Sequence, residues 1–591
     1  MPTIIEALAQ TKVIHTTSTS IQVEQTVAHE LRQIIGGRAE TKHASGLSAP
    51  AGSVRLAVIQ ERKKWASIHP ALDGTRDWIM VRMKNGSGIE LLASRPHLLY
   101  YGFTMLTEDW KALEAGEFTV GKILHPSFRN LRPVYDLFLT QHARTVRNFN
   151  REEHVRNLAR LGFSHAEVNG LAFAVPFERG PKGELLHRFY TYCPSLDQFV
   201  SSRLNKGIYD DDYLQANLNF LKTNAALAEK YGLSPGIVCF EPRSVPDNLL
   251  ERYPMLRGAR VDHPIRSWHP RYNLSIAHPV VREHYAEMME NLLREVPALE
   301  YMSVWSNDSG AGFEYTNSLY VGRNGSGYVI REWKGDTEIA EAAANNLVRF
   351  MKTLRDAGRK VNPNFRTLIR LEPFWVEHDY IWKQLDDGLD VEVSSLLTKG
   401  WKLAYQHPKY KEAREIHGTA LHNRFVDAEK PVIEELRKKK SEADVYFNPG
   451  TVWNHEPLLG IPFPQLVHDK LADMAKQGVT TPCFNGSTTP PSFAPYNINQ
   501  ELVRAFQADS NLDLDAFLHR KAAEWIGEPL AADLVKVWKH SDEAYRSFPL
   551  PIWIYSSWGN WYRLATRPIV PNIEAVSEEN REYYEKFLLA T

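Results

Sequence analysis

Short apolar runs alternate with amphipathic stretches through the middle of the chain. Runs rich in aliphatic and aromatic residues predict strands at residues 133–140, 165–171, 234–240, 301–305, 366–371, 389–395, 444–448 and 479–484. Between them, apolar positions repeat with helical spacing and predict helices, among them residues 151–161, 211–231, 280–295 and 337–357. A regular alternation of eight strands with helices predicts a (β/α)8 barrel, or TIM barrel, at residues 121–500.

The segments on either side of the barrel show different patterns. Residues 1–120 predict a small N-terminal α/β domain: a helix at 23–35, strands at 53–60, 78–83 and 88–93, and a helix near 98–106. Residues 501–591 predict a C-terminal helical segment with amphipathic helices at 514–526, 531–548 and 577–589. The predicted fold class is therefore α/β, with the barrel between these two parts.

Composition and charge narrow the classes of molecule that the chain could bind. Of its 591 residues, 43% are hydrophobic and 24% are charged, as in an ordinary globular protein. Its 70 Lys and Arg against 71 Asp and Glu leave a net charge of -1, which argues against nucleic acid or an anionic membrane as partner. No run of 18 or more apolar residues predicts a membrane span. We therefore expect a small or neutral partner.

The cysteines and the N-terminal residues indicate in which cellular compartment the protein is expected. Cys193, Cys239 and Cys483 lie far apart and lack the spacing of a zinc site or a disulfide framework. Residues 1–20 lack a basic start followed by an apolar core, so they do not resemble a signal peptide. We expect a cytoplasmic protein, or a periplasmic or secreted one if a signal peptide preceded this chain.

Candidate chemistry is concentrated in the stretch LEYMSVWSNDSGAGFEY at residues 299–315. An apolar strand ending at Trp305 is followed at once by Ser306, Asn307, Asp308 and a glycine-containing loop, and Glu314 comes shortly after. Barrels of this class hold their active sites at the carboxyl ends of the strands. The same residues also form ordinary turns, which remains the alternative.

Polar and aromatic residues follow the other predicted strands as well. At or near these strand ends lie Glu241, Arg243, Arg370, Glu372, Trp375, Glu392, Asn448, Trp453, His455, Glu456 and Asn485. Carboxyl groups can carry acid/base catalysis, while aromatic faces and amides suit sugar rings and their hydroxyls. The chain has no esterase elbow, phosphate loop or dinucleotide fingerprint. These carboxyl groups, aromatic rings and amides favour a carbohydrate substrate, without cofactor.

The motif VWSNDSGAGFEY, followed by SLYVGRNGSGYVIREW and by Ala344-Asn345-Asn346-Leu347, resembles α-glucuronidases of glycoside hydrolase family 67. The resemblance implies a glycoside hydrolase that cleaves terminal sugars such as uronic acids, in carbohydrate metabolism or polysaccharide degradation. By strand order it implies Asp308 as general acid, with Glu372 and Glu392 activating water with inversion. The family carries Glu at the acid position and Asp at one base position.

The motif is also loosely similar to hexosaminidases of glycoside hydrolase family 20. Those enzymes use an adjacent Asp-Glu pair on the fourth strand and let the N-acetyl group of the substrate attack. This chain has Asn307-Asp308 there, so substrate-assisted N-acetylhexosaminidase chemistry would have to recruit Glu314 or an acid from another strand. We keep it as the alternative function.

Other interpretations remain open for individual residues. Glu392 pairs with Arg370 inside the barrel in one of them, and Glu241 forms a local ion pair with Arg243 in another. Glu314 and Glu372 are loop acids in the simplest case. His455 and Glu456, with His422, lack the spacing of a metal site, and we predict no metal. A non-catalytic carbohydrate-binding barrel, a lyase, and a homodimer through the C-terminal helices are also open.

Overall fold

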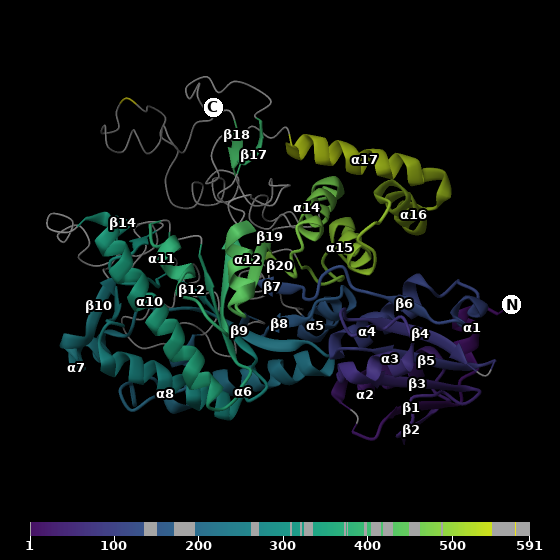
Figure 1. The fold of residues 1–591 in the computed structure, drawn as a ribbon, viewed down its shortest axis with the longest axis horizontal. Helices are drawn as coiled ribbons and strands as arrows, with labels where there is room; N and C mark the ends of the chain where they lie inside the picture. Colours follow the sequence, from purple (N-terminus) through teal and green to yellow (C-terminus); the bar gives the residue numbers. More distant parts are fainter. Residues whose placement is uncertain are drawn as a thin grey trace.

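The protein consists of an N-terminal α/β domain beside a barrel, with C-terminal helices packed along both (Figure 1). The computed structural model describes residues 2–19, 21–84, 86–134, 150–170, 195–261, 271–307, 310–318, 322–323, 335–371, 374, 376–394, 399–402, 415–417, 430–447, 461–485, 488–546 and 574. All structural statements below concern these residues.

A six-stranded mixed sheet forms the N-terminal domain, in the order β2-β1-β3-β5-β4-β6. Its strands, in that order, are Glu40–Ala44, Val13–Thr17, Ser53–Val58, Gly88–Ala93, Ile79–Lys84 and Lys122–Leu124. Alternate side chains of a strand point to opposite faces. One face of this sheet packs under α2 (Gln22–Ile34) and α4 (Pro96–Thr104), and the other packs against Trp65 and Trp78. Every position of β5 is therefore buried.

Eight strands form the second sheet, in the order β7-β20-β19-β16-β15-β12-β9-β8. In chain order they are β7 Arg132–Val134, β8 His165–Glu167, β9 Ser234–Phe240, β12 Tyr301–Trp305, β15 Arg366–Arg370, β16 Leu389–Ser394, β19 Ala443–Phe447 and β20 Thr481–Asn485. All hydrogen-bonded neighbours are parallel. The two end strands meet where the Ser164 N–H donates to the Leu131 carbonyl at 2.9 Å. The sheet thus closes in chain order, which confirms the predicted barrel.

The helices of the barrel alternate with its strands. They include α5 Arg151–Arg160, α6 Asp211–Lys230, α8 Pro279–Glu295, α10 Asp336–Arg359, α11 His378–Trp382, α12 Lys430–Lys438 and α14 Pro464–Lys476. The local sequence sets two of their starts: the Asn150 side chain accepts from two N–H groups of α5, and Pro279 occupies the first turn of α8. Because all strands of the barrel are parallel, their carboxyl ends lie at one edge of the sheet.

The chain ends in three described helices, α15 Ile498–Ala508, α16 Leu514–Ile526 and α17 Glu528–Arg546. The last two match the helices predicted at 514–526 and 531–548, and the helix predicted at 577–589 lies outside the described residues. The Tyr101 hydroxyl of the N-terminal domain donates to the Arg504 carbonyl at 2.7 Å, so α15 also contacts that domain. None of the described helices is long and apolar enough to cross a membrane.

Two features of the N-terminal part were not predicted. The strands β1 and β2 were missed, and β6 adds residues 122–124 to the N-terminal sheet, just past the boundary placed at residue 120.

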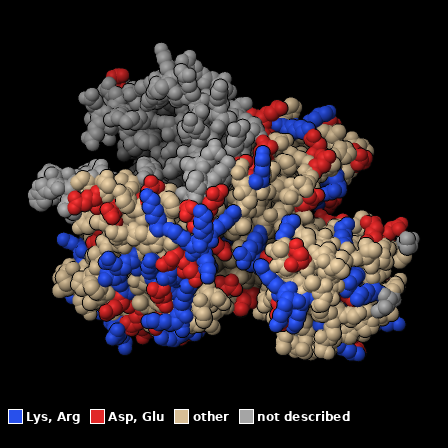
Figure 2. All heavy atoms as spheres, in the orientation of Figure 1, with Lys and Arg blue, Asp and Glu red and all other residues tan. Residues whose placement is uncertain are grey.

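Over the face shown in Figure 2, Lys and Arg are interspersed with Asp and Glu. This mixture agrees with the net charge of -1.

Candidate functional site

The carboxyl edge of the barrel brings several of the predicted residues together. Phe240 of β9 is paired with Trp305 of β12, and Arg370 of β15 is paired with Glu392 of β16. The strands β12 and β15 are in register as well. Since these four strands end at nearly the same level, the residues that follow them leave from one edge.

The structure describes only part of the predicted set. The predicted residues outside the described ranges are Asp308, Glu372, Trp375, Asn448, Trp453, His455 and Glu456. Asn485 is the last residue of β20. The described side chains are those of Glu241, Arg243, Trp305, Asn307, Glu314, Arg370 and Glu392.

Glu392 lies in the barrel interior with 0% of its surface exposed. Its Oε1 is 3.7 Å from Arg370 Nε, and its Oε2 is 3.6 Å from Arg132 Nη2. The Cys483 thiol donates to Oε2 at 3.6 Å. The pairing with Arg370, left open by the sequence, is thus present, and a second arginine joins it. A carboxylate buried between cations is stabilised in its charged form.

Trp305 is buried beside this ion pair, with 2% of its surface exposed. The Arg370 guanidinium carbon lies 4.0 Å from the centre of its ring, a cation–π contact. Phe240 meets the same ring edge to face, with centroids 5.8 Å apart. In this arrangement Trp305 packs against protein groups and supports the edge of the barrel.

Asn307 shapes the loop that follows β12. Its φ of 57° lies in the left-handed region, which Asn tolerates better than most residues. Its side-chain oxygen accepts from the Phe313 N–H at 3.1 Å and from the Thr316 hydroxyl at 2.9 Å. These contacts tie Phe313 and Thr316 back to Asn307.

Glu314 lies further along the same loop and is half-buried. Its Oε2 accepts from the Ser275 hydroxyl at 3.0 Å. Burial raises the pKa of Glu314 above its usual value, and hydrogen bonds from Ser275 and from the Ala277 backbone oppose that rise. Among the predicted acids described, Glu314 keeps the most contact with solvent.

A second carboxyl group lies close to Glu241 and was not predicted. Asp197 belongs to a short 3-10 helix, Leu196–Gln198, in the connection between β8 and α6. Asp197 and Glu241 have 6% and 1% of their surfaces exposed. The capping pattern of Ser195 with Gln198 marks this turn in the sequence, but nothing local to it indicates that Asp197 is buried.

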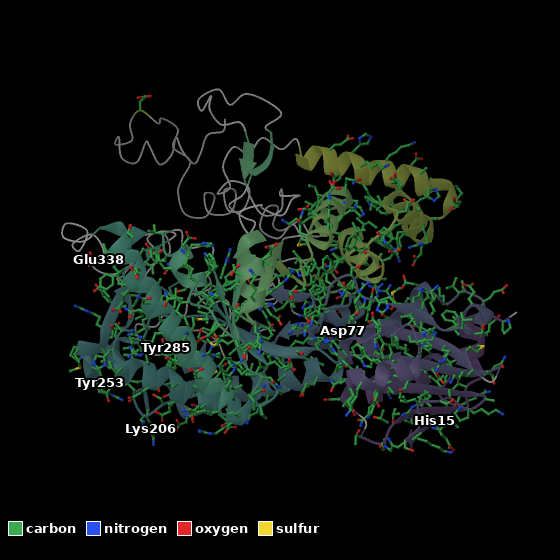
Figure 3. The ribbon with its side chains drawn as sticks, viewed as in Figure 1. His15, Asp77, Lys206, Tyr253, Tyr285 and Glu338 are labelled. Atoms are coloured by element: carbon green, nitrogen blue, oxygen red, sulfur yellow. The ribbon has the colours of Figure 1, made fainter. Side chains whose placement is uncertain are left out.

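Three residues hold these carboxyl groups. The Tyr209 hydroxyl donates to Asp197 Oδ2 at 3.0 Å, and the Tyr285 hydroxyl donates to Glu241 Oε2 at 3.2 Å. Arg243 joins the two, because its backbone N–H donates to Glu241 Oε2 at 3.0 Å and its side-chain Nε lies 3.6 Å from Asp197 Oδ1. Tyr285, on α8, is labelled in Figure 3.

Burial makes both carboxyl groups hold their protons more tightly. It raises the pKa of Asp197 to about 7, and the hydrogen bond from Tyr209 opposes that rise. Burial also raises the pKa of Glu241 well above its usual value, and the negative charge of Asp197 raises it further. A carboxyl group kept protonated near neutral pH is the form that acid catalysis requires.

Backbone hydrogen bonds connect the segment after Glu241 to the loop after β12. The Ser244 N–H donates to the Gly310 carbonyl at 2.8 Å, and the Gly312 N–H donates to the Pro242 carbonyl at 3.1 Å. Arg243 and Ala311 form an antiparallel bridge between them. The two strand ends therefore share one folded unit.

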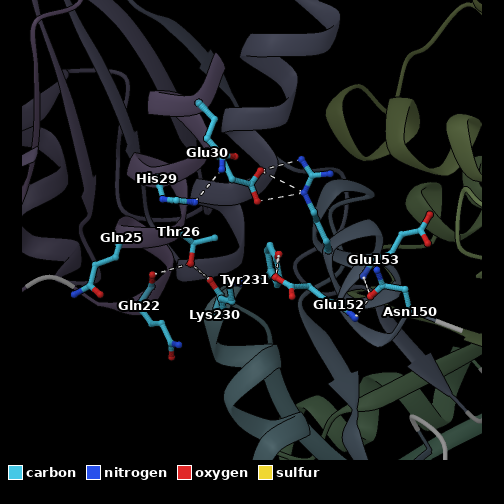
Figure 4. Close-up of a pocket in the computed structure, with 12 residues that line it drawn as sticks. Gln22, Gln25, Thr26, His29, Glu30, Asn150, Glu152, Glu153, Lys230 and Tyr231 are labelled. Atoms are coloured by element: carbon cyan, nitrogen blue, oxygen red, sulfur yellow. Dashed lines mark hydrogen bonds and ion pairs between the residues drawn. The ribbon is translucent and has the colours of Figure 1, made fainter. Parts of the chain in front are cut away.

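A groove of about 720 Å³ lies elsewhere, at the junction of α2 with α5 and α6 (Figure 4). Two pairs of charged side chains in it contact each other: Arg156 Nη2 lies 2.9 Å from Glu30 Oε2, and Lys230 contacts Glu152. The predicted site residues do not line it. Within the described part of the chain, no three His, Cys, Asp or Glu side chains are grouped as metal ligands would be.

Known proteins resemble this chain in structure and not in sequence. No protein-family profile and no curated protein matches it. A GH138 enzyme targeting pectin rhamnogalacturonan II superposes with a TM-score of 0.53 at 11% identity, over 90% of this chain and 55% of that enzyme. This chain thus spans about half the length of that enzyme.

Two further structures superpose less closely. The Streptomyces plicatus N-acetyl-β-hexosaminidase gives a TM-score of 0.46 at 14% identity, over 89% of this chain and 91% of the enzyme. A family 89 glycoside hydrolase from Clostridium perfringens gives 0.46 at 10% identity, over 76% and 47%. The match to the GH138 enzyme shows that the two chains share a fold, which in this chain is an α/β barrel.

Proposed function

We propose that the chain is a glycoside hydrolase that removes terminal sugars from glycans or glycosides, with uronic acids as the first substrate class. The common edge of the barrel carries this proposal. The strands β9, β12, β15 and β16 end nearly level. In the sequence, each contains a carboxyl group near its end or is followed by one within three residues: Glu241, Asp308, Glu372 and Glu392. Glycoside hydrolysis needs one carboxylic acid and one carboxylate.

The roles follow from this requirement. Asp308 is the general acid that protonates the leaving oxygen, and Glu372 takes a proton from the attacking water. Glu392 supports Glu372 from the neighbouring strand, where Arg132 and Arg370 fix its charge and position. Such fixed charges lower the barrier only if they are in place before the reaction.

The predicted substrate-binding residues divide into two groups. Arg243, Trp305, Asn307 and Arg370 are engaged with protein groups, so we assign them to the wall that supports the site. Glu241 is buried and accepts from Tyr285 and Arg243, so it joins this wall. Direct contacts to the sugar are assigned to Glu314, Trp375, Asn448, Trp453, His455, Glu456 and Asn485. Several amides and aromatic rings among them suit a polyol.

A panel of 4-nitrophenyl glycosides and short oligosaccharides tests the proposal. Wild type is compared with Asp308→Asn and Glu372→Gln, and with Glu341→Gln, an exposed carboxyl group on α10, as control. We expect each site variant to lose at least about 100-fold in kcat, and the control to match wild type. Proton NMR of the freshly released sugar identifies its anomer, and inversion is expected.

The other outcomes are equally informative. Wild-type rates in both Asp308→Asn and Glu372→Gln would overturn the assignment of roles. Cleavage of N-acetylhexosaminides alone would replace uronic acids as the substrate class. Calorimetric binding of a sugar without turnover would replace hydrolysis by carbohydrate binding, and a new ultraviolet absorbance in the product would indicate elimination.

A further inference from the structure

The groove between α2 and the barrel has no role in the catalysis proposed above. Its volume of about 720 Å³ lies within the range of small-molecule sites, which often occur where two domains meet. One side of the groove is α2 of the N-terminal domain, and the other is formed by the start of α5 and the end of α6 (Figure 4). Size and position therefore suit a binding site, and the lining indicates the class of ligand.

Contacts between the two domains hold the floor of the groove in place. The Thr26 hydroxyl donates to the Lys230 carbonyl at 2.6 Å, and the Tyr231 hydroxyl donates to Glu152 Oε1 at 2.8 Å. The Tyr231 ring packs edge to face on Tyr100 of α4, with centroids 5.1 Å apart. Both Thr26 and Tyr231 are buried. Because protein contacts fix this floor, a ligand does not have to order it on binding.

The charged side chains of the groove are engaged with protein groups. Its Arg and Lys side chains pair with two of its three carboxylates. The third carboxylate, Glu153, accepts from the Ser492 N–H at 2.9 Å and from the Ser492 hydroxyl at 2.7 Å. Among the described residues that line the groove, no Arg or Lys is left to pair with an anionic ligand, and no carboxylate is left for a cationic one. The groove therefore favours an uncharged, polar ligand.

A row of exposed polar side chains follows one face of α2 along the groove: Gln22, Gln25, His29 and Gln33. His29 Nε2 lies 3.0 Å from Gln33 Nε2. No hydrogen bond within the described part of the chain engages the side-chain amides of Gln22 and Gln25. A helix rises about 5.4 Å per turn, so the row extends over about 16 Å with about one polar side chain per turn.

The spacing and the chemistry of this row match an extended glycan. Each ring of a linear β-1,4-linked chain advances by nearly the length of one helix turn. Amide and imidazole groups both donate and accept hydrogen bonds, as sugar hydroxyls require. We propose that the groove is a second carbohydrate-binding site, which holds a linear, uncharged oligosaccharide of about three rings along α2. Neither the site nor its ligand class rests on the proposed catalysis.

Chemical labelling of His29 tests the proposal at the groove itself. Diethylpyrocarbonate modifies exposed histidines, and mass spectrometry of peptides follows each histidine separately. The probes are cellotetraose, xylotetraose and mannotetraose as uncharged chains, and tetragalacturonate as an anionic chain. We expect at least one uncharged probe, at saturation, to slow the labelling of His29 about threefold, because the bound chain covers its ring. His519, exposed on α16, is the control and should be labelled at an unchanged rate.

Variants show whether the row on α2 holds the sugar. The probe concentration that gives half of the protection of His29 should rise about fivefold in Gln25→Ala, which loses an amide that bonds to the chain. Gln215→Ala, exposed on α6 and outside the groove, is the matched control and should equal wild type. Alanine is a strong helix former, so both variants should fold, which far-ultraviolet circular dichroism verifies. Because the predicted site residues do not line the groove, this readout reports on the groove alone.

Labelling of His29 at the same rate with and without every uncharged probe would overturn the inference. Protection by tetragalacturonate alone would overturn the ligand class, and an unchanged half-protection concentration in Gln25→Ala would overturn the role of the row. Protection of His29 without cleavage of any glycoside would support the inference and count against the proposed function. Cleavage of a glycoside with unprotected His29 would do the reverse.

Discussion

Arg370 lies over the ring of Trp305, with its guanidinium carbon 4.0 Å from the ring centre, and its Nε is 3.7 Å from Glu392. One side chain of β15 therefore contacts both neighbouring strands, β12 and β16. All three side chains belong to the edge where the catalytic residues are proposed. Arg is suited to this position because its planar cation can stack and form an ion pair at the same time.

Truncating this arginine should destabilise the protein. We expect Arg370→Ala to lower the free energy of unfolding by about 3 kcal/mol, because Glu392 loses one partner of a buried ion pair. Arg370→Lys should lose less, since it keeps the charge but not the planar stack. Urea unfolding followed by circular dichroism measures both. Arg349→Ala, exposed on α10, is the control and should change stability by less than about 0.5 kcal/mol. A loss in Arg370→Ala no larger than the control's would contradict the prediction.

Asp197 should give stability a pH dependence of definite sign. Burial raises its pKa to about 7 in the folded chain, against about 4 in the unfolded chain. The folded chain thus binds the proton more tightly. The stability gained is fully present below about pH 4 and is lost as the pH rises through about 7. We expect Asp197→Asn to flatten this decline in the free energy of unfolding.

The measurement is urea unfolding at a series of pH values across that window. Asp211→Asn removes an exposed carboxyl group on α6 and should leave the slope of wild type unchanged. Glu241→Gln should act in the same direction as Asp197→Asn, because burial raises the pKa of Glu241 as well. If wild type and Asp197→Asn lose stability equally across the window, Asp197 does not titrate differently on folding.

The sequence allowed the barrel to be predicted because its strands are short apolar runs that stop at polar loops. The strand β2, Glu40–Ala44, was missed because it is an edge strand with mostly exposed side chains and no apolar alternation. Asp197 was missed because burial and pairing with Arg243 arise from tertiary contacts. Glu392 remained ambiguous for a similar reason: an acid inside an apolar strand fits catalysis and an ion pair equally well.

Asn307 should tolerate few substitutions. Asn307→Ala removes an acceptor with two donors and places a side chain without local polar contacts in the left-handed region, so we expect a loss of about 2 kcal/mol. Asn307→Asp keeps the acceptor and should lose least, with Asn307→Gly between them because it relieves only the backbone. Urea unfolding ranks the three variants. Equal losses in the Gly and Ala variants would show that backbone conformation contributes nothing.

Gly236 of β9 should not accept even one additional carbon atom. A Cβ there would overlap the ring of Tyr301 on the neighbouring strand. That ring has little room to move, because the Arg132 guanidinium carbon lies 5.1 Å from its centre on one side and His165 packs against it edge to face. We therefore expect Gly236→Ala to lower the free energy of unfolding by about 1–3 kcal/mol.

The matched control is Gly46→Ala in an exposed bend after β2, where no atom lies within 4 Å of the added carbon. It should change stability by less than about 0.5 kcal/mol. Combining Gly236→Ala with Tyr301→Val removes the obstructing ring, so the double variant should lose less than the sum of the two single losses. Strict additivity would mean that Gly236→Ala destabilises through the strand backbone, and that the close approach of Tyr301 is not what requires glycine at this position.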